Sequence, residues 1–118
     1  MKKLVILGES DSGKSTLACL IANVSGSTSF CYIEGTDIES ELQAFASEKD
    51  RVFIFDEVMK KDLPVVIDLL GRDSLEYRPL FKTNSVTVSP LLVIVSNEIV
   101  REDLPTNAPD TTVITLKK

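Results

Sequence analysis

The sequence predicts an α/β fold with a parallel sheet, and three observations point to it. Short apolar runs alternate along the chain with segments of helical periodicity. Residues 8–16 read G-E-S-D-S-G-K-S-T, which matches the phosphate-binding pattern G-x-x-x-x-G-K-[ST]. Two carboxylates directly follow the apolar run at residues 51–55. With 118 residues, of which 43% are hydrophobic and 26% charged, the chain is expected to form one domain over residues 1–118.

The first strand is expected at residues 4–7 and the first helix at residues 14–24, with the phosphate-binding pattern between them. Two glycines let the backbone curl so that N–H groups point at phosphate oxygens, and the helix N-terminus adds partial positive charge. Lys14 is expected to reach the β- and γ-phosphates, and the Ser15 hydroxyl to coordinate Mg²⁺. The alternative is a glycine-rich turn that matches by chance. The residues predicted to bind the nucleotide are Gly8, Glu9, Ser10, Asp11, Ser12, Gly13, Lys14, Ser15 and Thr16.

A second strand is expected at residues 29–33, and a helix can begin at Thr36 or Asp37. The two cysteines, Cys19 and Cys31, have no C-x-x-C spacing, and the chain has no histidine. A zinc site is therefore not expected, and both thiols are interpreted as small core residues.

The third strand, residues 51–55, is apolar enough to lie centrally in a sheet. It ends in Asp56 and Glu57, the Walker B pattern. Asp56 would hold Mg²⁺, directly or through water, and Glu57 would polarise the water that attacks the γ-phosphate. The alternative is an acidic surface loop. The position favours the functional interpretation, because open α/β sheets carry ligand residues at the carboxyl ends of their strands.

A helix over residues 60–70 is expected to present an apolar stripe formed by Leu63, Val66, Ile67 and Leu70. Residues 77–88 are typical of a hairpin. Arg72, Arg78 and Lys82 gather here in an otherwise acidic chain, so the hairpin could carry Arg78 and Lys82 to the phosphates of a nucleic acid. Ordinary surface charges are the alternative.

A fourth strand at residues 91–95 ends in Ser96, Asn97 and Glu98, and a fifth strand is expected at residues 112–116. An amide beside the Walker B strand can orient the attacking water or sense the γ-phosphate, which makes Asn97 a catalytic candidate with Glu57 and Lys14. Asparagine is also common in turns, which is the alternative.

The net charge of −5 argues against a protein that coats nucleic acid with its whole surface. Apolar runs stay far below the roughly 18 residues of a membrane span, and the first run is too short for a signal peptide. An intracellular, reducing compartment without membrane contact is therefore expected.

In this order, the motifs resemble those of the superfamily 3 helicases, the replicative ATPases of small DNA viruses, phages and plasmids. The likeness is closest to the ATPase module of phage and poxvirus-type primase-helicases. It covers about residues 3 to 116 and depends on four segments, at residues 8–16, 52–57, 70–82 and 92–98.

The resemblance implies an AAA+-like P-loop NTPase fold with strand order 5-1-4-3-2 and flanking helices. It implies ATP and Mg²⁺ bound between the subunits of a ring, often a homohexamer, that translocates on single-stranded DNA. Arg78 and Lys82 would then lie on the segment leading to the hairpin of the central pore. It also implies a virus- or phage-encoded protein in the host cytoplasm or nucleus, with a separate primase or origin-binding protein as a possible partner.

The sequence departs from the family where an arginine finger is usual, because residues 107–112 contain no arginine and Arg101 is the only nearby candidate. A nucleotide-dependent interaction module with little turnover therefore stays open as an alternative. A small P-loop kinase is a further alternative, although the arginine-rich lid of such enzymes is not visible.

Overall fold

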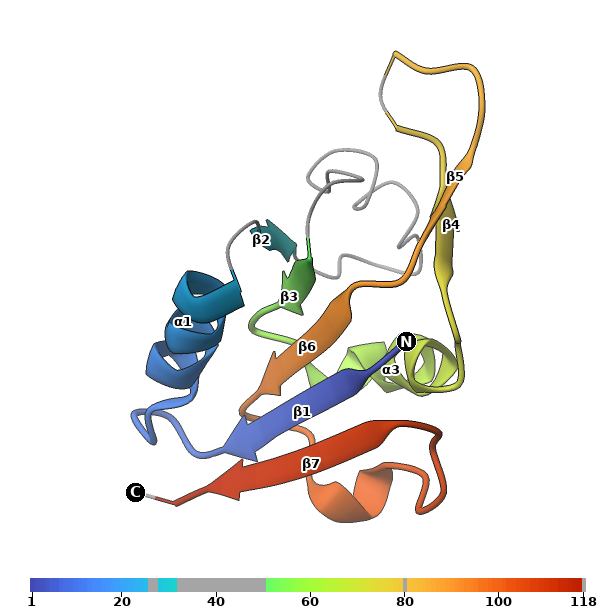
Figure 1. Cartoon of the computed structure of the whole chain (residues 1–118). Coiled ribbons are helices and arrows are strands. Elements are labelled where there is room, and N and C mark those ends of the chain that lie inside the picture. Colours follow the sequence, from blue (N-terminus) through green and yellow to red (C-terminus); the bar gives the residue numbers. More distant parts are fainter. Residues whose placement is uncertain (26–27, 32–50, 80, 118) are drawn as a thin grey trace.

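The computed structural model describes residues 1–25, 28–31, 51–79 and 81–117 (Figure 1). The helix expected from residue 36 or 37 lies outside these ranges. The elements in chain order are β1 (Lys3–Gly8), α1 (Lys14–Ser25), β2 (Thr28–Cys31), β3 (Val52–Phe55), η1 (Lys60–Asp62), α3 (Leu63–Leu70), β4 (Leu75–Tyr77), β5 (Val86–Val88), β6 (Leu91–Ser96), η2 (Arg101–Asp103) and β7 (Thr111–Leu116).

Within the described residues, β2, β3, β6, β1 and β7 form a five-stranded sheet in that spatial order, and every neighbouring pair is parallel. If the strands of this sheet alone are numbered one to five in chain order, β6 becomes strand 4 and β7 becomes strand 5. The spatial order, starting from β7, is then 5-1-4-3-2, which is the order that the resemblance implies. Because all strands run the same way, the loops after β1, β3 and β6 emerge at one edge. The structure is therefore a mixed α/β fold with a parallel sheet.

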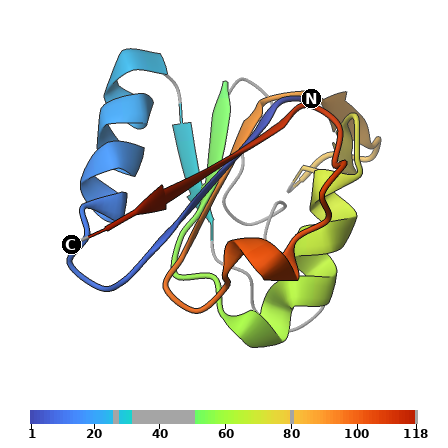
Figure 2. The same cartoon turned by 90° about the horizontal axis from the view of Figure 1, so that it is seen from below.

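Helices cover both faces of the sheet, with α1 on one face and α3 and η2 on the other (Figure 2). Side chains of β1 alternate between two cores: Ile6 packs in the cluster beneath α1, whereas Val5 and Leu7 pack in the larger cluster on the α3 face. The side chains on both faces of the central strands are buried, so these strands are continuous apolar runs in the sequence. All four residues of β3 are buried.

Residues 60–70 form two pieces instead of one helix. The 3-10 turn η1 precedes α3, which carries a proline in its first turn, and the Asp62 carboxylate accepts the Met59 N–H at 3.1 Å. With this start, Val66, Leu69 and Leu70 face the sheet and Ile67 is 42% exposed. The expected stripe was therefore wrong at Ile67. Cys19 is also exposed, against the expectation of a core residue, because its neighbour Ala18 faces the sheet instead.

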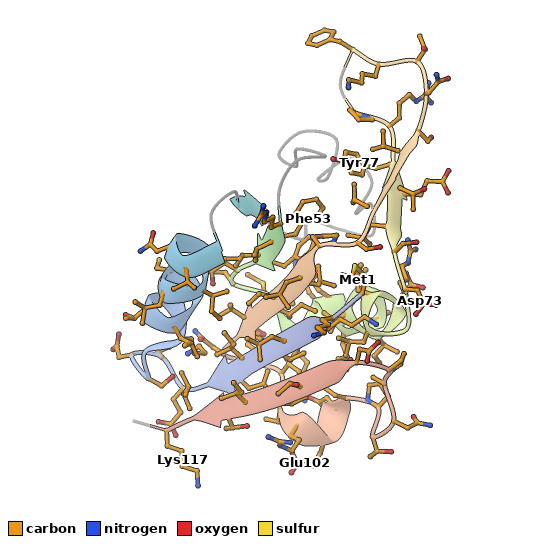
Figure 3. The ribbon with its side chains drawn as sticks, in the orientation of Figure 1. Met1, Phe53, Asp73, Tyr77, Glu102 and Lys117 are labelled. Atoms are coloured by element: carbon orange, nitrogen blue, oxygen red, sulfur yellow. The ribbon has the colours of Figure 1, made fainter. Side chains whose placement is uncertain are left out.

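The expected hairpin is present as β4 and β5, which pair antiparallel with Leu75 opposite Val88 and Tyr77 opposite Val86. Leu75 and Tyr77 are buried in the larger core, which anchors the base of the hairpin. Its tip projects beyond the body of the sheet (Figures 1 and 3). No helix in the described ranges is both long enough and apolar enough to cross a membrane.

Candidate functional site

The loop of residues 8–16, here called the phosphate loop, connects the end of β1 to the first turn of α1. Gly8 has a φ of +149°, and a Cβ atom there would lie 2.4 Å from the carbonyl oxygen of Leu116 on β7. Gly13 has a φ of +92°, with open space where a side chain would be. Gly13 is therefore needed for its backbone conformation, and Gly8 for its conformation and for the close approach of β7 as well.

The side chain of Lys14 folds into the phosphate loop and is only 6% exposed. Its ammonium group donates to the carbonyl oxygen of Glu9 and to the Ser12 hydroxyl, the latter at 3.2 Å. Both acceptors are neutral. A phosphate oxygen that replaced them would form a charge-assisted bond, which is roughly twice as strong as a neutral one.

The two carboxylates after β3 lie at the same edge of the sheet as the phosphate loop. Asp56 Oδ1 accepts the backbone N–H of Glu57 at 2.8 Å, and Glu57 adopts a φ of +53°. Asp56 is half-buried, whereas Glu57 is exposed to solvent. The turn therefore directs consecutive carboxylates into different surroundings.

Asn97 follows β6 and contacts the phosphate loop directly, because its Nδ2 donates to the Ser10 hydroxyl at 3.2 Å. The residue before it, Ser96, is 1% exposed and donates its hydroxyl proton to the carbonyl oxygen of Val58 at 2.6 Å. The Ser96 hydroxyl oxygen itself accepts the backbone N–H groups of Glu98 and Ile99 at 3.2 and 3.1 Å. Ser96 therefore joins the loop after β6 to the loop after β3.

A cavity of about 500 Å³, here called the first cavity, brings most of the predicted site residues together. Its lining residues are Ser10, Asp11, Gly13, Lys14, Ser15, Thr16, Asp56, Glu57, Val95 and Asn97. Gly8 and Glu9 line a second cavity of about 800 Å³ that shares Asn97 with the first. Ser12 contacts Lys14 from within the loop.

Ser96 was not predicted as part of the site. The available signals were a hydroxyl residue at the end of an otherwise apolar strand and its place directly before Asn97 in the segment 92–98.

The remaining predicted residues lie elsewhere. Arg78 and Lys82 are exposed on the connection between β4 and β5 and line neither cavity. The guanidinium group of Arg101 donates to the carbonyl oxygen of Val113 at 2.8 Å, and its side chain lines the second cavity. Arg101, the arginine-finger candidate near the last strand, is therefore held outside the first cavity of its own chain.

No protein-family model matches the sequence, and no curated protein matches it either. Solved structures do match. The C-terminal region of NrS-1, in an apo form, superimposes with a TM-score of 0.63 at 14% identity over 98% of this chain. NtrX from Brucella abortus, solved in complex with ATP, gives a TM-score of 0.56 at 13% identity over 98% of the chain.

This chain spans only 28% and 33% of the lengths of these two structures. At such low identity the likeness concerns the fold, which is similar to that of P-loop proteins.

Proposed function

We propose that this protein binds ATP with Mg²⁺ in the first cavity and hydrolyses it. One observation carries the proposal: the phosphate loop, the two carboxylates after β3 and the amide after β6 line the same cavity. The fold shared with NtrX, a protein solved in complex with ATP, is consistent with this assignment.

The phosphates would be held by the backbone N–H groups of the loop and by Lys14. Among the described residues there is no group of three or more His, Cys, Asp or Glu side chains placed to hold a metal ion. Mg²⁺ does not require one at such a site, because it keeps several waters and takes phosphate oxygens. The Ser15 hydroxyl and the Asp56 carboxylate, which both line the cavity, fit that role.

Hydrolysis requires a water in line with the bond between the γ-phosphorus and the bridging oxygen. Glu57 would accept the proton of this water as its oxygen bonds to phosphorus, while ADP leaves with the electrons of the broken bond. Asn97 would give up its hydrogen bond to Ser10 when the substrate binds. Its amide would then hydrogen-bond the attacking water and orient it. Lys14, Glu57 and Asn97 are thus the proposed catalytic residues.

A second proposal is that the chain acts as a helicase-type motor on single-stranded DNA, assembled as a ring. The hairpin supports it, because its tip projects from the sheet and carries exposed Arg78 and Lys82 beside Phe81, which is 97% exposed. Cations bind the backbone phosphates of a single strand, and aromatic rings stack on its bases.

The alternative of a nucleotide-dependent interaction module with little ATP turnover is favoured by a different observation. Lys14 is the only basic side chain that lines the first cavity within the described residues. A finger supplied in trans raises phosphoryl-transfer rates by about 10³ to 10⁵. Without such a group, from this chain or a partner, ATP would be bound and turned over slowly.

The test is ATP hydrolysis by the purified protein, with and without single-stranded DNA, at several protein concentrations. Lys14→Ala serves as the inactive control, and Lys61→Ala, which changes an exposed lysine on η1, as the matched one. Turnover that rises with DNA and steeply with concentration supports the ring motor. Binding without turnover supports the module, and ATP affinity unchanged by Lys14→Ala would refute the site.

A further inference from the structure

We propose that Glu98 is a positioning residue, which holds the loop after β3 so that Glu57 keeps the backbone conformation from which it acts in hydrolysis. The inference rests on the proposed function, since it presumes that Glu57 is the base. It gives a role to a carboxylate that lines neither the first nor the second cavity.

A short segment occurs twice in the chain, each time directly after a strand of the sheet. Residues 56–64 read D-E-V-M-K-K-D-L-P and follow β3, whereas residues 97–105 read N-E-I-V-R-E-D-L-P and follow β6. Glu57 and Glu98 occupy the same position in the two segments, and both segments end in D-L-P. Because β3 and β6 are parallel neighbours, the two segments leave the sheet side by side.

The two segments also have the same local structure. Met59 and Val100 are both extended, with φ and ψ of −98° and 160° in the first and −111° and 162° in the second, and each precedes a 3-10 turn. In both turns the carboxylate of the aspartate three residues later accepts the N–H of this extended residue at 3.1 Å. Val58 and Ile99, the preceding residues, are both buried. The shared sequence therefore specifies one turn structure, which the chain uses twice.

The two glutamates differ in what they contact. Glu57 lines the first cavity, whereas Glu98 Oε1 accepts the backbone N–H of Lys60, in the other segment, at 3.4 Å. The first N–H groups of a helical turn have no partner within the turn, so this carboxylate stabilises the start of η1. The ammonium group of Lys60 in turn lies 3.5 Å from Asp103 Oδ2. Carboxylates of the second segment thus hold both ends of one residue in the first.

The backbone of Glu57 needs this support. Its φ of +53° lies in the left-handed region, which a residue with a side chain adopts at a cost in free energy and keeps only where its surroundings fix it. Two hydrogen bonds tie Val58 to the end of β6, and the bond from Glu98 fixes the chain two residues further on. Without that bond, the turn would relax and carry the Glu57 carboxylate away from the attacking water.

The experiment measures ATP hydrolysis by variants of the full chain with Mg²⁺, together with the affinity for a non-hydrolysable ATP analogue by calorimetry. Glu98→Ala removes the acceptor, whereas Glu98→Gln removes the charge and keeps an oxygen that can accept. Glu76→Ala is the control, because it removes an exposed carboxylate on β4 that lines neither cavity. Urea denaturation of each variant ensures that turnover is compared at equal folded fractions.

A hydrogen bond to an exposed charged group favours one conformation over another by roughly tenfold or less. We therefore expect Glu98→Ala to lower kcat by about five- to tenfold and to change the affinity for the analogue by less than about twofold. Glu98→Gln should restore most of the lost turnover, and Glu76→Ala should change neither quantity.

A double-mutant cycle separates an action through Glu57 from an independent one. In a Glu57→Gln background no base is left to position, so adding Glu98→Ala should lower single-turnover hydrolysis by less than about twofold. An independent role would lower it by the same factor as in the wild type.

The outcomes separate this inference from the proposed function. Wild-type kcat in Glu98→Ala, an equal loss in Glu98→Gln, or equal factors in the two backgrounds overturns the inference and leaves ATP hydrolysis standing. A parallel loss of analogue affinity and turnover in Glu98→Ala overturns it too, since a misplaced base would spare binding. Failure of the wild type to hydrolyse ATP overturns the proposed hydrolysis and the inference with it.

Discussion

At the scale of single residues, Gly8 is the point where the phosphate loop packs directly against β7. A Cβ atom at this position would lie 2.4 Å from the carbonyl oxygen of Leu116 and 2.9 Å from the Ser12 hydroxyl. The first of these neighbours is backbone within β7 and can move only if the strand pairing of β1 and β7 shifts. The loop and the sheet edge are therefore packed as one unit.

Gly8→Ala should consequently lower the free energy of unfolding by about 3 kcal/mol, from overpacking and from the positive φ together. Gly71→Ala is the control, because a Cβ atom there meets its nearest neighbour, the carbonyl oxygen of Asp68, at an ordinary 3.6 Å. Urea denaturation of both variants measures the difference. Equal losses in the free energy of unfolding would show that β7 moves away from the added Cβ atom at no cost in stability.

Glu57 is the second residue whose role can be tested alone. Glu57→Gln keeps the shape of the side chain and removes its basicity, so ATP binding should persist while turnover falls by about 10² to 10⁴. Glu76→Gln, which alters an exposed carboxylate on β4, should leave both quantities unchanged. Equal loss of binding and turnover in Glu57→Gln would give this residue a structural role instead.

At the scale of elements, the two loops that carry Asp56 and Asn97 are connected to each other. The buried Ser96 hydroxyl donates to Val58 and accepts two backbone N–H groups from its own loop. A backbone bond from the Val58 N–H to the carbonyl oxygen of Val95, at 3.0 Å, runs beside it. The carboxylate and amide parts of the first cavity are thereby held in a fixed relation.

Ser96→Ala should lower the free energy of unfolding by about 1–3 kcal/mol, because it leaves buried backbone groups without their partner. Turnover should fall as well, since Asn97 is the next residue. Chemical denaturation and ATPase assays on the same preparation measure both effects, with Ser85→Ala on the exposed hairpin as the control. A variant as stable as the wild type would show that water replaces the hydroxyl.

The hairpin is the element that tests the nucleic-acid proposal. Arg78→Ala combined with Lys82→Ala should weaken binding to single-stranded DNA and flatten its salt dependence by about one phosphate contact per residue changed. Basal ATP hydrolysis should persist, because neither side chain lines the first cavity. Fluorescence anisotropy at several salt concentrations measures the slope, and an unchanged slope would make these two cations ordinary surface charges.

At the scale of the whole molecule, the order of the elements was predictable, because strands that are buried on both faces are continuous apolar runs in the sequence. The convergence of Lys14, Asp56 and Asn97 was predictable too, since the carboxyl ends of parallel strands meet at one edge. Their chemical roles stay predictions.

Two features were not predicted, for different physical reasons. The exposure of Ile67 follows from where α3 begins, a local feature that the apolar spacing of residues 60–70 did not reveal. The contact of Gly8 with Leu116 follows from the pairing of β1 with β7, which are remote in sequence, so no local pattern carries information about it.

The pairing of β1 has a consequence for the order of events during synthesis. The strand that carries the phosphate loop is made first, yet its two partners, β6 and β7, begin at residues 91 and 111. Contacts between segments so far apart form slowly, because the long intervening loop must be closed, at a cost in chain entropy, before stabilising contacts can form. Until β6 has been made, β1 therefore lacks both of its neighbours in the sheet. The residues that line the first cavity can come together only after Asn97 has been added to the chain.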